Sequence, residues 1–369
     1  MRKLRGLIRE HKALYAYLII FFIATAFLLF QKNNKPLMSF IAQITLWIRQ
    51  ALAEAFDLVP VSVAELLVIC AGLAVLIYIV KTIRDIIKSK KRLRLLYDRF
   101  IIALCVVLTV FFLFNLFLGS TYWSDSFQDK SGIYALPSTV DQLYETTKFF
   151  ADKASESGAM VRRDEHGLFN EPIDEIFQNS NLTYGHLGSQ FPFLSSGHNK
   201  PKKLLFSKLM SRLSYTGFYF PFTGEANINI DAPASFLPST IAHEQAHQRG
   251  IAFEQEANFV AVLACIGSED PAYVYSGYLL GFIHLNNALY RHDRERFNEV
   301  YASLSDEVKA DLQFNNEYWR KYESPISGVS DAVYDTFLKS YGQELGILSY
   351  GAVVDLLVTY FGSALAVCR

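Results

Sequence analysis

The chain has few cysteines, and none of them shows the spacing of a metal-binding motif. Cys70 and Cys105 fall in long apolar runs, Cys265 lies in an Ala-rich segment and Cys368 is penultimate. This pattern excludes a disulfide framework and a cysteine zinc site, so a metal site would have to use histidine and carboxylate ligands. We expect the thiols to be buried packing residues.

The C-terminal two thirds of the chain also lacks an excess of basic residues. Residues 119–369 hold 19 Lys and Arg against 30 Asp and Glu, whereas residues 1–118 hold 16 against 6. An acidic C-terminal part argues against nucleic acid as a partner. We find no internal repeat and no low-complexity linker in the sequence.

Charge is almost absent from three long apolar runs, at residues 13–30, 61–80 and 100–118. Each run is close to the roughly 20 residues that a helix needs to span a bilayer. We therefore predict a membrane domain at residues 1–118 with three transmembrane helices. The first run has no small-residue cleavage site and is predicted to be a retained anchor.

Lys and Arg are distributed unevenly around these runs. Residues 1–12 carry five, residues 31–60 carry three and residues 81–99 carry eight. Because basic loops stay on the cytoplasmic side, the N-terminus is predicted to be cytoplasmic and residues 119–369 to be extracytoplasmic.

Two further apolar segments have alternative interpretations. Residues 38–56 are amphipathic and contain Trp47, which favours a helix lying in the membrane interface; the alternative is a fourth span, which would place Arg49 within the membrane. Residues 345–367 are interrupted by Asp355 and are predicted to be a core or interfacial helix, with a membrane span as the alternative.

The segment His243-Glu244-Gln245-Ala246-His247 carries the clearest chemical signal. On a helix its two histidines project from one face one turn apart and can bind one Zn²⁺. Glu244 can then take a proton from water whose pKa the metal lowers, which is metallopeptidase chemistry. The alternative is a polar helix surface that carries two histidines by chance.

A third protein ligand is expected soon after this motif. Glu254 and Glu256 lie at the start of an apolar segment that is predicted to be a second helix. Glu254 shares a helix face with Asn258, whereas Glu256 points away from both. We therefore favour Glu254 as the ligand and keep Glu256 as the alternative.

The segment Glu254-Gln255-Glu256-Ala257-Asn258 resembles the ExxA(D/N) helix of the gluzincin metallopeptidases. The resemblance implies that Glu254 binds zinc and that Asn258 braces a zinc-binding histidine. In gluzincins the third ligand usually lies much further from HExxH. The whole chain, with three N-terminal membrane helices before HEQAHQRGIAFEQEANF, is similar to an uncharacterised family of bacterial membrane proteins of unknown function, which implies a multi-pass protein of the bacterial cell membrane.

The remainder of residues 119–369 is predicted to form a helix-rich, zincin-like α+β domain. Residues 217–230 alternate like a small β-hairpin, which either aligns an extended substrate, as the gluzincin resemblance implies, or simply supports the helix. Residues 162–199 are predicted to be a long loop over the site. Oxyanion-stabilising candidates are four tyrosines, Tyr273, Tyr275, Tyr278 and Tyr290.

Together these features predict a membrane-anchored, zinc-dependent metallopeptidase that acts on a peptide or protein substrate. His243, His247 and Glu254 would hold the zinc ion, and Glu244 would be the general base. The alternative is a catalytically inactive, peptidase-like membrane sensor or assembly protein, which the tight spacing of the ligands suggests.

Overall fold

The computed structural model describes residues 12–197, 200–343 and 352–367. It divides into two compact units. Unit 1 comprises Met1–Trp47 and Val63–Ser124, and unit 2 comprises Ile48–Ser62 and Asp125–Arg369. The basic N-terminus, residues 345–351 and Cys368 lie outside the described residues.

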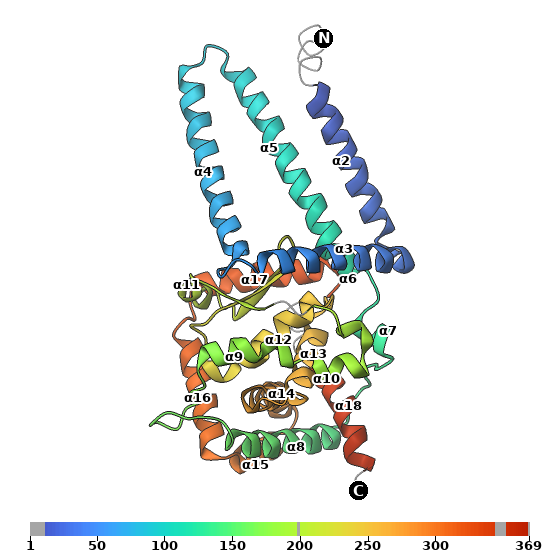
Figure 1. Cartoon of the computed structure of the whole chain (residues 1–369), viewed down its shortest axis with the longest axis vertical. Coiled ribbons are helices and arrows are strands. Elements are labelled where there is room, and N and C mark those ends of the chain that lie inside the picture. The colour runs from blue at the N-terminus through green and yellow to red at the C-terminus, as the bar shows by residue number, and fades with distance from the viewer. Residues whose placement is uncertain (1–11, 198–199, 344–351, 368–369) are drawn as a thin grey trace. The chain divides into compact units, whose positions relative to one another are not determined.

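Unit 1 contains three long apolar helices, α2 (Lys12–Phe30), α4 (Val63–Lys88) and α5 (Arg92–Phe114), shown in Figure 1. All three are long and apolar enough to cross a membrane, and α5 continues through η2 (Asn115–Gly119) into α6 (Ser120–Tyr122). Helices α2 and α5 pack together through hydroxyl and ring contacts. The prediction of three spans is confirmed, and the chain is a mainly α-helical membrane protein.

Helix α3 (Lys35–Phe56) connects these spans and contributes to both units. It is not among the helices apolar enough to span a membrane. Its Arg49 is 1% exposed and donates a hydrogen bond to the Tyr219 hydroxyl at 3.3 Å, inside unit 2. A buried protein contact therefore accommodates the charge that a fourth span would have placed in lipid.

Unit 2 is a helical domain with a small sheet. Its helices are α7 (Phe127–Ser131), α8 (Val140–Gly158), α9 (Ile173–Asn179), α10 (Gly185–Gln190), α11 (Ser207–Arg212), α12 (Leu237–Gln248), α13 (Glu254–Ile266), α14 (Pro271–His292), α15 (Arg294–Ser303), α16 (Asp306–Arg320), α17 (Pro325–Ser340) and α18 (Val353–Val367), with short 3₁₀ turns η3 (Ser180–Leu182), η4 (Pro192–Leu194) and η5 (Ala234–Phe236).

Helix α14 is the centre of the helical core and packs against α8, α12, α13, α15 and α18. Its close approach to α8 depends on Gly281, where a Cβ atom would lie 2.3 Å from the Phe150 ring. Helix α18 contributes Val353, Leu356 and Leu357, which are fully buried. The described part of residues 345–367 is therefore a core helix of unit 2, in line with the favoured interpretation.

The sheet has three strands in the order β1-β3-β2. Strand β3 (Glu225–Ile228) is central, parallel to β1 (Lys202–Lys203) and antiparallel to β2 (Gly217–Phe220). The predicted hairpin is present as β2 and β3, and the sheet packs against α12. Strand β3, which precedes α12, is thus paired on both sides, and β1 and β2 are the edge strands of the sheet.

Two sequence-based predictions of local structure are wrong. Residues 162–199 are not one long loop, because the described part forms α9, α10 and the short turns η3 and η4 around buried apolar side chains such as Ile176 and Leu187. The helical periodicity of residues 202–214 predicts one helix, but the segment begins with strand β1 and becomes helical only at Ser207. Both segments gain their structure from contacts distant in sequence.

Candidate metal centre

Helix α12 ends in a turn that shapes the candidate metal site. Gly250 has a φ of +81°, its N–H donates to His247 O at 3.0 Å, and the Ile251 N–H donates to Ala246 O at 3.1 Å. This is the Schellman arrangement, in which a left-handed glycine reverses the chain after a helix. Helix α12 therefore ends at the dipeptide Arg249-Gly250.

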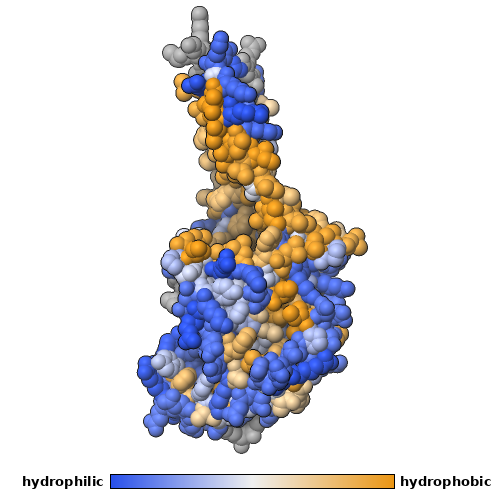
Figure 2. All heavy atoms as spheres, turned by 90° about the vertical axis from the view of Figure 1, so that its left-hand side faces the viewer, coloured by the Kyte–Doolittle hydropathy of each residue, from blue (hydrophilic) through white to orange (hydrophobic). Residues whose placement is uncertain are grey.

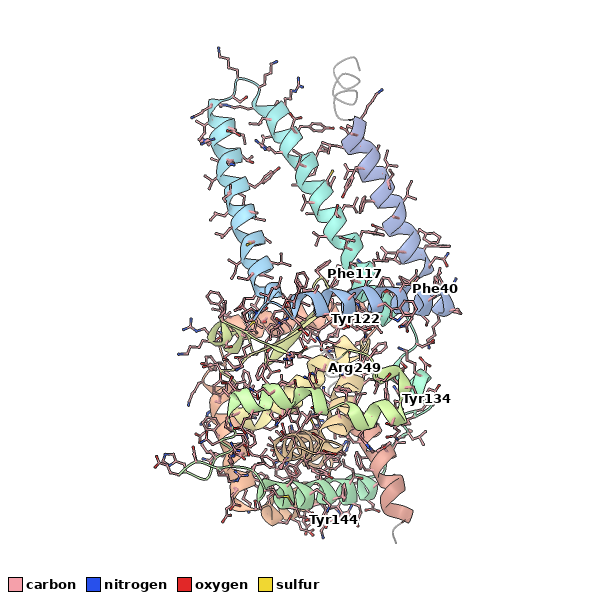
Figure 3. All side chains as sticks on the ribbon, in the orientation of Figure 1. Phe40, Phe117, Tyr122, Tyr134, Tyr144 and Arg249 are labelled. Carbon is pink, nitrogen blue, oxygen red and sulfur yellow. The ribbon has the colours of Figure 1, made fainter. Side chains whose placement is uncertain are left out.

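A short link then leads directly into α13, with Glu254 as its first residue. Arg249 holds this link from within unit 2, where it is labelled in Figure 3. Its guanidinium stacks 3.7 Å from the Tyr184 ring centroid and donates to Leu194 O and Gln245 O. Burial lowers the pKa of Arg249 to about 10, which leaves it charged at neutral pH.

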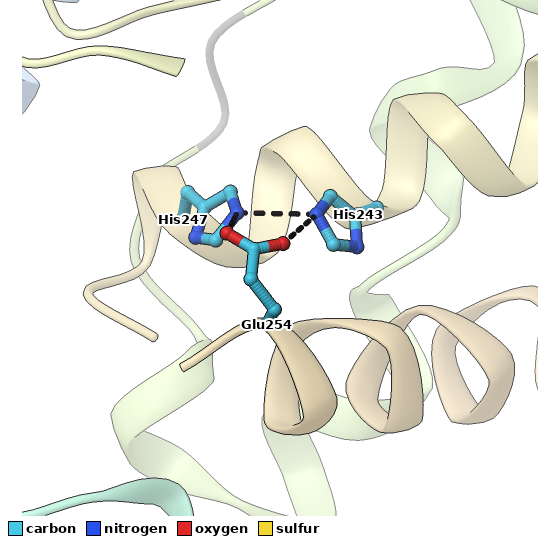
Figure 4. Close-up of side chains that lie close together, drawn as sticks. All are labelled: His243, His247 and Glu254. Atoms are coloured by element: carbon cyan, nitrogen blue, oxygen red, sulfur yellow. Dashed lines mark hydrogen bonds and ion pairs between the residues drawn. The ribbon is translucent and has the colours of Figure 1, made fainter. Parts of the chain in front are cut away.

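The reversal brings His243, His247 and Glu254 together, as Figure 4 shows. The two histidine Nε2 atoms lie 3.1 Å apart, and the Glu254 carboxylate oxygens lie 3.2 Å from His243 Nε2 and 3.6 Å from His247 Nε2. Tetrahedral zinc with bonds of 2.0–2.1 Å requires donor atoms about 3.3 Å apart. A spacing of seven residues between His247 and Glu254 is therefore enough to bring the two histidine nitrogens and a Glu254 oxygen together.

Hydrogen bonds orient both imidazoles for metal binding. His247 Nδ1 donates to Ile251 O at 2.7 Å, and His243 Nδ1 lies 3.0 Å from Asn258 Oδ1, one turn after Glu254. With their protons on Nδ1, both rings direct Nε2 lone pairs toward each other and toward a carboxylate. Such a set of acceptors is stable around a cation, so the donor chemistry fits a zinc ion.

Glu244 lies beside this cluster, 4% exposed, and its Oε2 has no hydrogen-bond partner among the described residues. Burial raises the pKa of Glu244 to about 8, although attraction to His243 limits the rise. Strand β2 covers the side chain: a Cβ atom on Gly217 would lie 2.9 Å from Glu244 Oε1. An orphaned buried carboxylate beside a donor cluster is suited to proton transfer with a water molecule.

The alternative ligand Glu256 points elsewhere. Its carboxylate accepts hydrogen bonds from the Phe127 N–H at 2.7 Å and from the Gln128 N–H and side chain. It therefore fixes the start of α7 to α13. The structure brings Glu254, and not Glu256, to the histidines.

Tyr334 of α17 is a site residue that the sequence did not reveal. Its hydroxyl donates to Glu254 Oε1 at 2.8 Å. Burial alone would raise the pKa of Glu254, but attraction to His247 and His243 and the hydrogen bond from Tyr334 lower it to about 2. The carboxylate is thus held ionised. No local pattern marks Tyr334, because it lies 80 residues from its partner.

A cavity of about 220 Å³ opens beside His243. Apolar side chains from three elements, η5, α14 and α16, contribute to its wall, namely Phe236, Leu280, Ile283 and Trp319, and His284 of α14 also lines it. Burial lowers the pKa of His284 to about 4, so its ring is neutral at neutral pH. A neutral imidazole in the wall of this cavity can donate a hydrogen bond.

The four tyrosines predicted to stabilise an oxyanion do not line this cavity. The Tyr273 hydroxyl donates to Ile176 O, and the Tyr275 hydroxyl donates to Asp311. Tyr278 packs against Phe149 and Phe150, and Tyr290 against Phe297. They are structural residues of α14, and His284 on the same helix is the residue that lines the cavity beside His243.

Comparison with known proteins gives a single finding. No curated protein and no solved structure matches the chain. A family profile described as "Protein of unknown function (DUF3810)" matches residues 40–358, which include part of unit 1 and the whole candidate metal centre. The chain therefore belongs to the DUF3810 family.

Proposed function

We propose that the chain is a membrane-anchored zinc metallopeptidase with a zincin-like catalytic unit. The observation that carries the proposal is the convergence of His243 Nε2, His247 Nε2 and a Glu254 oxygen, all within 4.8 Å of one another, next to the buried Glu244. Two nitrogen donors and one carboxylate are the ligand set of many hydrolytic zinc sites.

A zinc ion held by these residues would supply a Lewis acid that lowers the pKa of water toward neutrality. Glu244 accepts the proton of the attacking water, whose oxygen bonds to the peptide carbonyl carbon. Glu244 then delivers that proton to the departing amine as the C–N bond breaks.

Two neighbouring groups complete the proposed reaction site. His284 lines the cavity next to His243 and would donate a hydrogen bond to the carbonyl oxygen as negative charge develops on it. Strand β2 would pair with the extended backbone of the substrate, because β2 is an edge strand and its Gly217 packs against Glu244.

The proposed location is a bacterial cell membrane, with unit 2 on the extracytoplasmic side. The distribution of Lys and Arg supports this orientation, since residues 81–99 carry eight basic groups and residues 31–60 carry three. The substrate would then be an extracytoplasmic peptide or protein.

The alternative function, a sensor that binds a partner without cleavage, rested on the tight spacing of the ligands. The turn at Gly250 accommodates that spacing, and the three donors converge. The geometry therefore favours the enzyme, and the sensor is an outcome of the test below.

The test compares wild type with Glu244→Gln, which keeps the shape of the side chain but cannot accept a proton. Purified full-length chains are analysed for zinc by mass spectrometry, and cells expressing each are analysed for new protein N-termini. We expect about one zinc in both chains and new N-termini only with wild type. The exposed Glu295→Gln serves as the control. Equal N-termini with wild type and Glu244→Gln would support the sensor.

A further inference from the structure

Unit 2 exposes a row of large apolar side chains on α17. Ile326, Val329 and Val333 are each 65% exposed. Their spacing of three and four residues places them on one face of the helix. Another face carries Tyr334, which bonds to Glu254, and the fully buried Leu338. One face of α17 therefore contacts the candidate metal centre through Tyr334, while another presents aliphatic groups outward.

Helix α11 lies next to α17 and adds to this surface. Tyr215 lies just after α11 in the chain, and its ring makes an edge contact with the Tyr334 ring, with 5.9 Å between the centroids. Leu209 on α11 is 51% exposed, and the exposed Lys208 and Arg212 flank it. Basic groups beside aliphatic ones are typical of segments that lie at a lipid headgroup boundary.

The segment Ile48–Ser62, which belongs to unit 2, lies at the same end. Figure 1 shows α11 and α17 at the end of unit 2 that includes Ile48–Phe56, the C-terminal part of α3, whereas α8 and α15 form the opposite end. Ile48 is 44% exposed and Leu58 is 88% exposed. Figure 2 shows hydrophobic residues gathered at this end of unit 2, while hydrophilic residues cover most of the rest of the face in view.

The chain continues from this end of unit 2 directly into a membrane span. The membrane-spanning α4 begins at Val63, directly after Ser62. Ser62 is tied into unit 2, because its hydroxyl donates to Asn227 Oδ1 at 2.6 Å, and Lys202 Nζ donates to Val59 O at 2.6 Å. The sheet of unit 2 is therefore anchored to a segment whose next residue enters a membrane span.

We propose that this end of unit 2, formed by Ile48, Leu58, Leu209 and the outward face of α17, rests in the boundary between headgroups and acyl chains of the lipid bilayer. Burial of these six aliphatic side chains there, three of them on α17, is favourable because it removes apolar surface from water. Soluble proteins rarely expose such a row of aliphatic side chains, and contact with the bilayer accounts for its presence on α17.

The contact places the candidate metal centre one helix away from the membrane surface. Because Tyr334 on the inner face of α17 bonds to Glu254, the helix that rests on lipid also covers the site. This consequence rests on the proposed peptidase function: the substrates would be peptide segments close to the membrane surface, such as the ends of membrane-embedded or lipid-anchored chains.

The test replaces single residues of the full-length chain with p-benzoyl-phenylalanine and irradiates the protein in phosphatidylcholine vesicles that contain a fluorescent phosphatidylcholine. We expect covalent lipid adducts at Val329 and Val333, several-fold above those at Asn298, an exposed residue of α15 at the opposite end. Phe22, 65% exposed on the membrane helix α2, is the positive control.

Two outcomes would overturn the proposal. Cross-linked dimers at Val333 without lipid adducts would assign the face to a second copy of the chain. Adducts at Phe22 but none at Val329 or Val333 would leave α17 in water. The readout requires no catalysis, so a failure of the peptidase proposal is seen separately, through zinc content and N-termini.

Discussion

At the residue scale, two glutamates two positions apart have different roles. Both Glu254 and Glu256 are buried at the start of α13. The helix directs them to opposite sides, so Glu254 meets the histidines of α12 while Glu256 caps the backbone of α7. Their closeness in sequence makes them matched controls for one another.

We predict that Glu254→Ala loses most of its zinc, whereas Glu256→Ala retains about one zinc per chain and is less stable. Glu256→Ala leaves buried N–H groups of α7 without an acceptor, which costs roughly 1–3 kcal/mol. Metal analysis by mass spectrometry and denaturant unfolding would measure the two effects. If Glu254→Ala kept its zinc and Glu256→Ala lost it, Glu256 would be the zinc ligand and our assignment of Glu254 would be wrong.

Sequence reasoning found the residues of the site that lie close together in the chain. His243, Glu244, His247 and Glu254 follow from helical periodicity and short-range spacing, and a role for Asn258 follows from the gluzincin resemblance. Other contributors come from distant segments and escape any local pattern. The contact of Gly217 with Glu244 requires the pairing of β2 with β3, and Tyr334 reaches Glu254 only because α17 folds back over α13.

At the element scale, the turn between α12 and α13 determines the geometry of the candidate metal centre. Gly250 adopts a left-handed conformation that lets Ile251 O accept the His247 Nδ1 proton. A side chain at this φ costs about 1 kcal/mol or more, and any shift of Ile251 would turn the imidazole. The dipeptide Arg249-Gly250 is a sequence signal for the end of α12, but it does not predict the hydrogen bond between His247 Nδ1 and Ile251 O.

We predict that Gly250→Ala weakens zinc binding about tenfold, the lower bound of effects seen when a partner of a metal ligand is lost. Gly132→Ala is the control, because Gly132 ends α7 with a φ of +73° and has open space around it. Both variants carry similar backbone strain. Titration against a zinc chelator should therefore separate them, and equal affinities would show that the turn does not orient His247.

At the scale of the whole molecule, the sequence predicted the three spans and a helix-rich C-terminal part with a small sheet. It did not reveal that Ile48–Ser62 belongs to unit 2. That membership depends on Arg49 bonding to Tyr219 and Ser62 bonding to Asn227, contacts that join positions 170 and 165 residues apart. Hydropathy detects a span because lipid selects it locally, whereas such pairings depend on the folded chain.

We predict that the C-terminus is extracytoplasmic. Alkaline phosphatase fused after Arg369 should be active in a bacterial host, and green fluorescent protein at the same place should be dark. The reason is electrostatic: the eight basic residues at 81–99 hold the loop between α4 and α5 in the cytoplasm, so α5 must run outward. Replacing Lys88, Lys90 and Lys91 with Gln should lower the phosphatase signal, whereas the same changes at Lys309 and Lys339, outside the loop, should not. If the green fluorescent protein fusion were fluorescent and the phosphatase fusion inactive, the predicted orientation would be wrong. Unit 2, with its candidate metal centre, would then lie on the cytoplasmic side of the membrane.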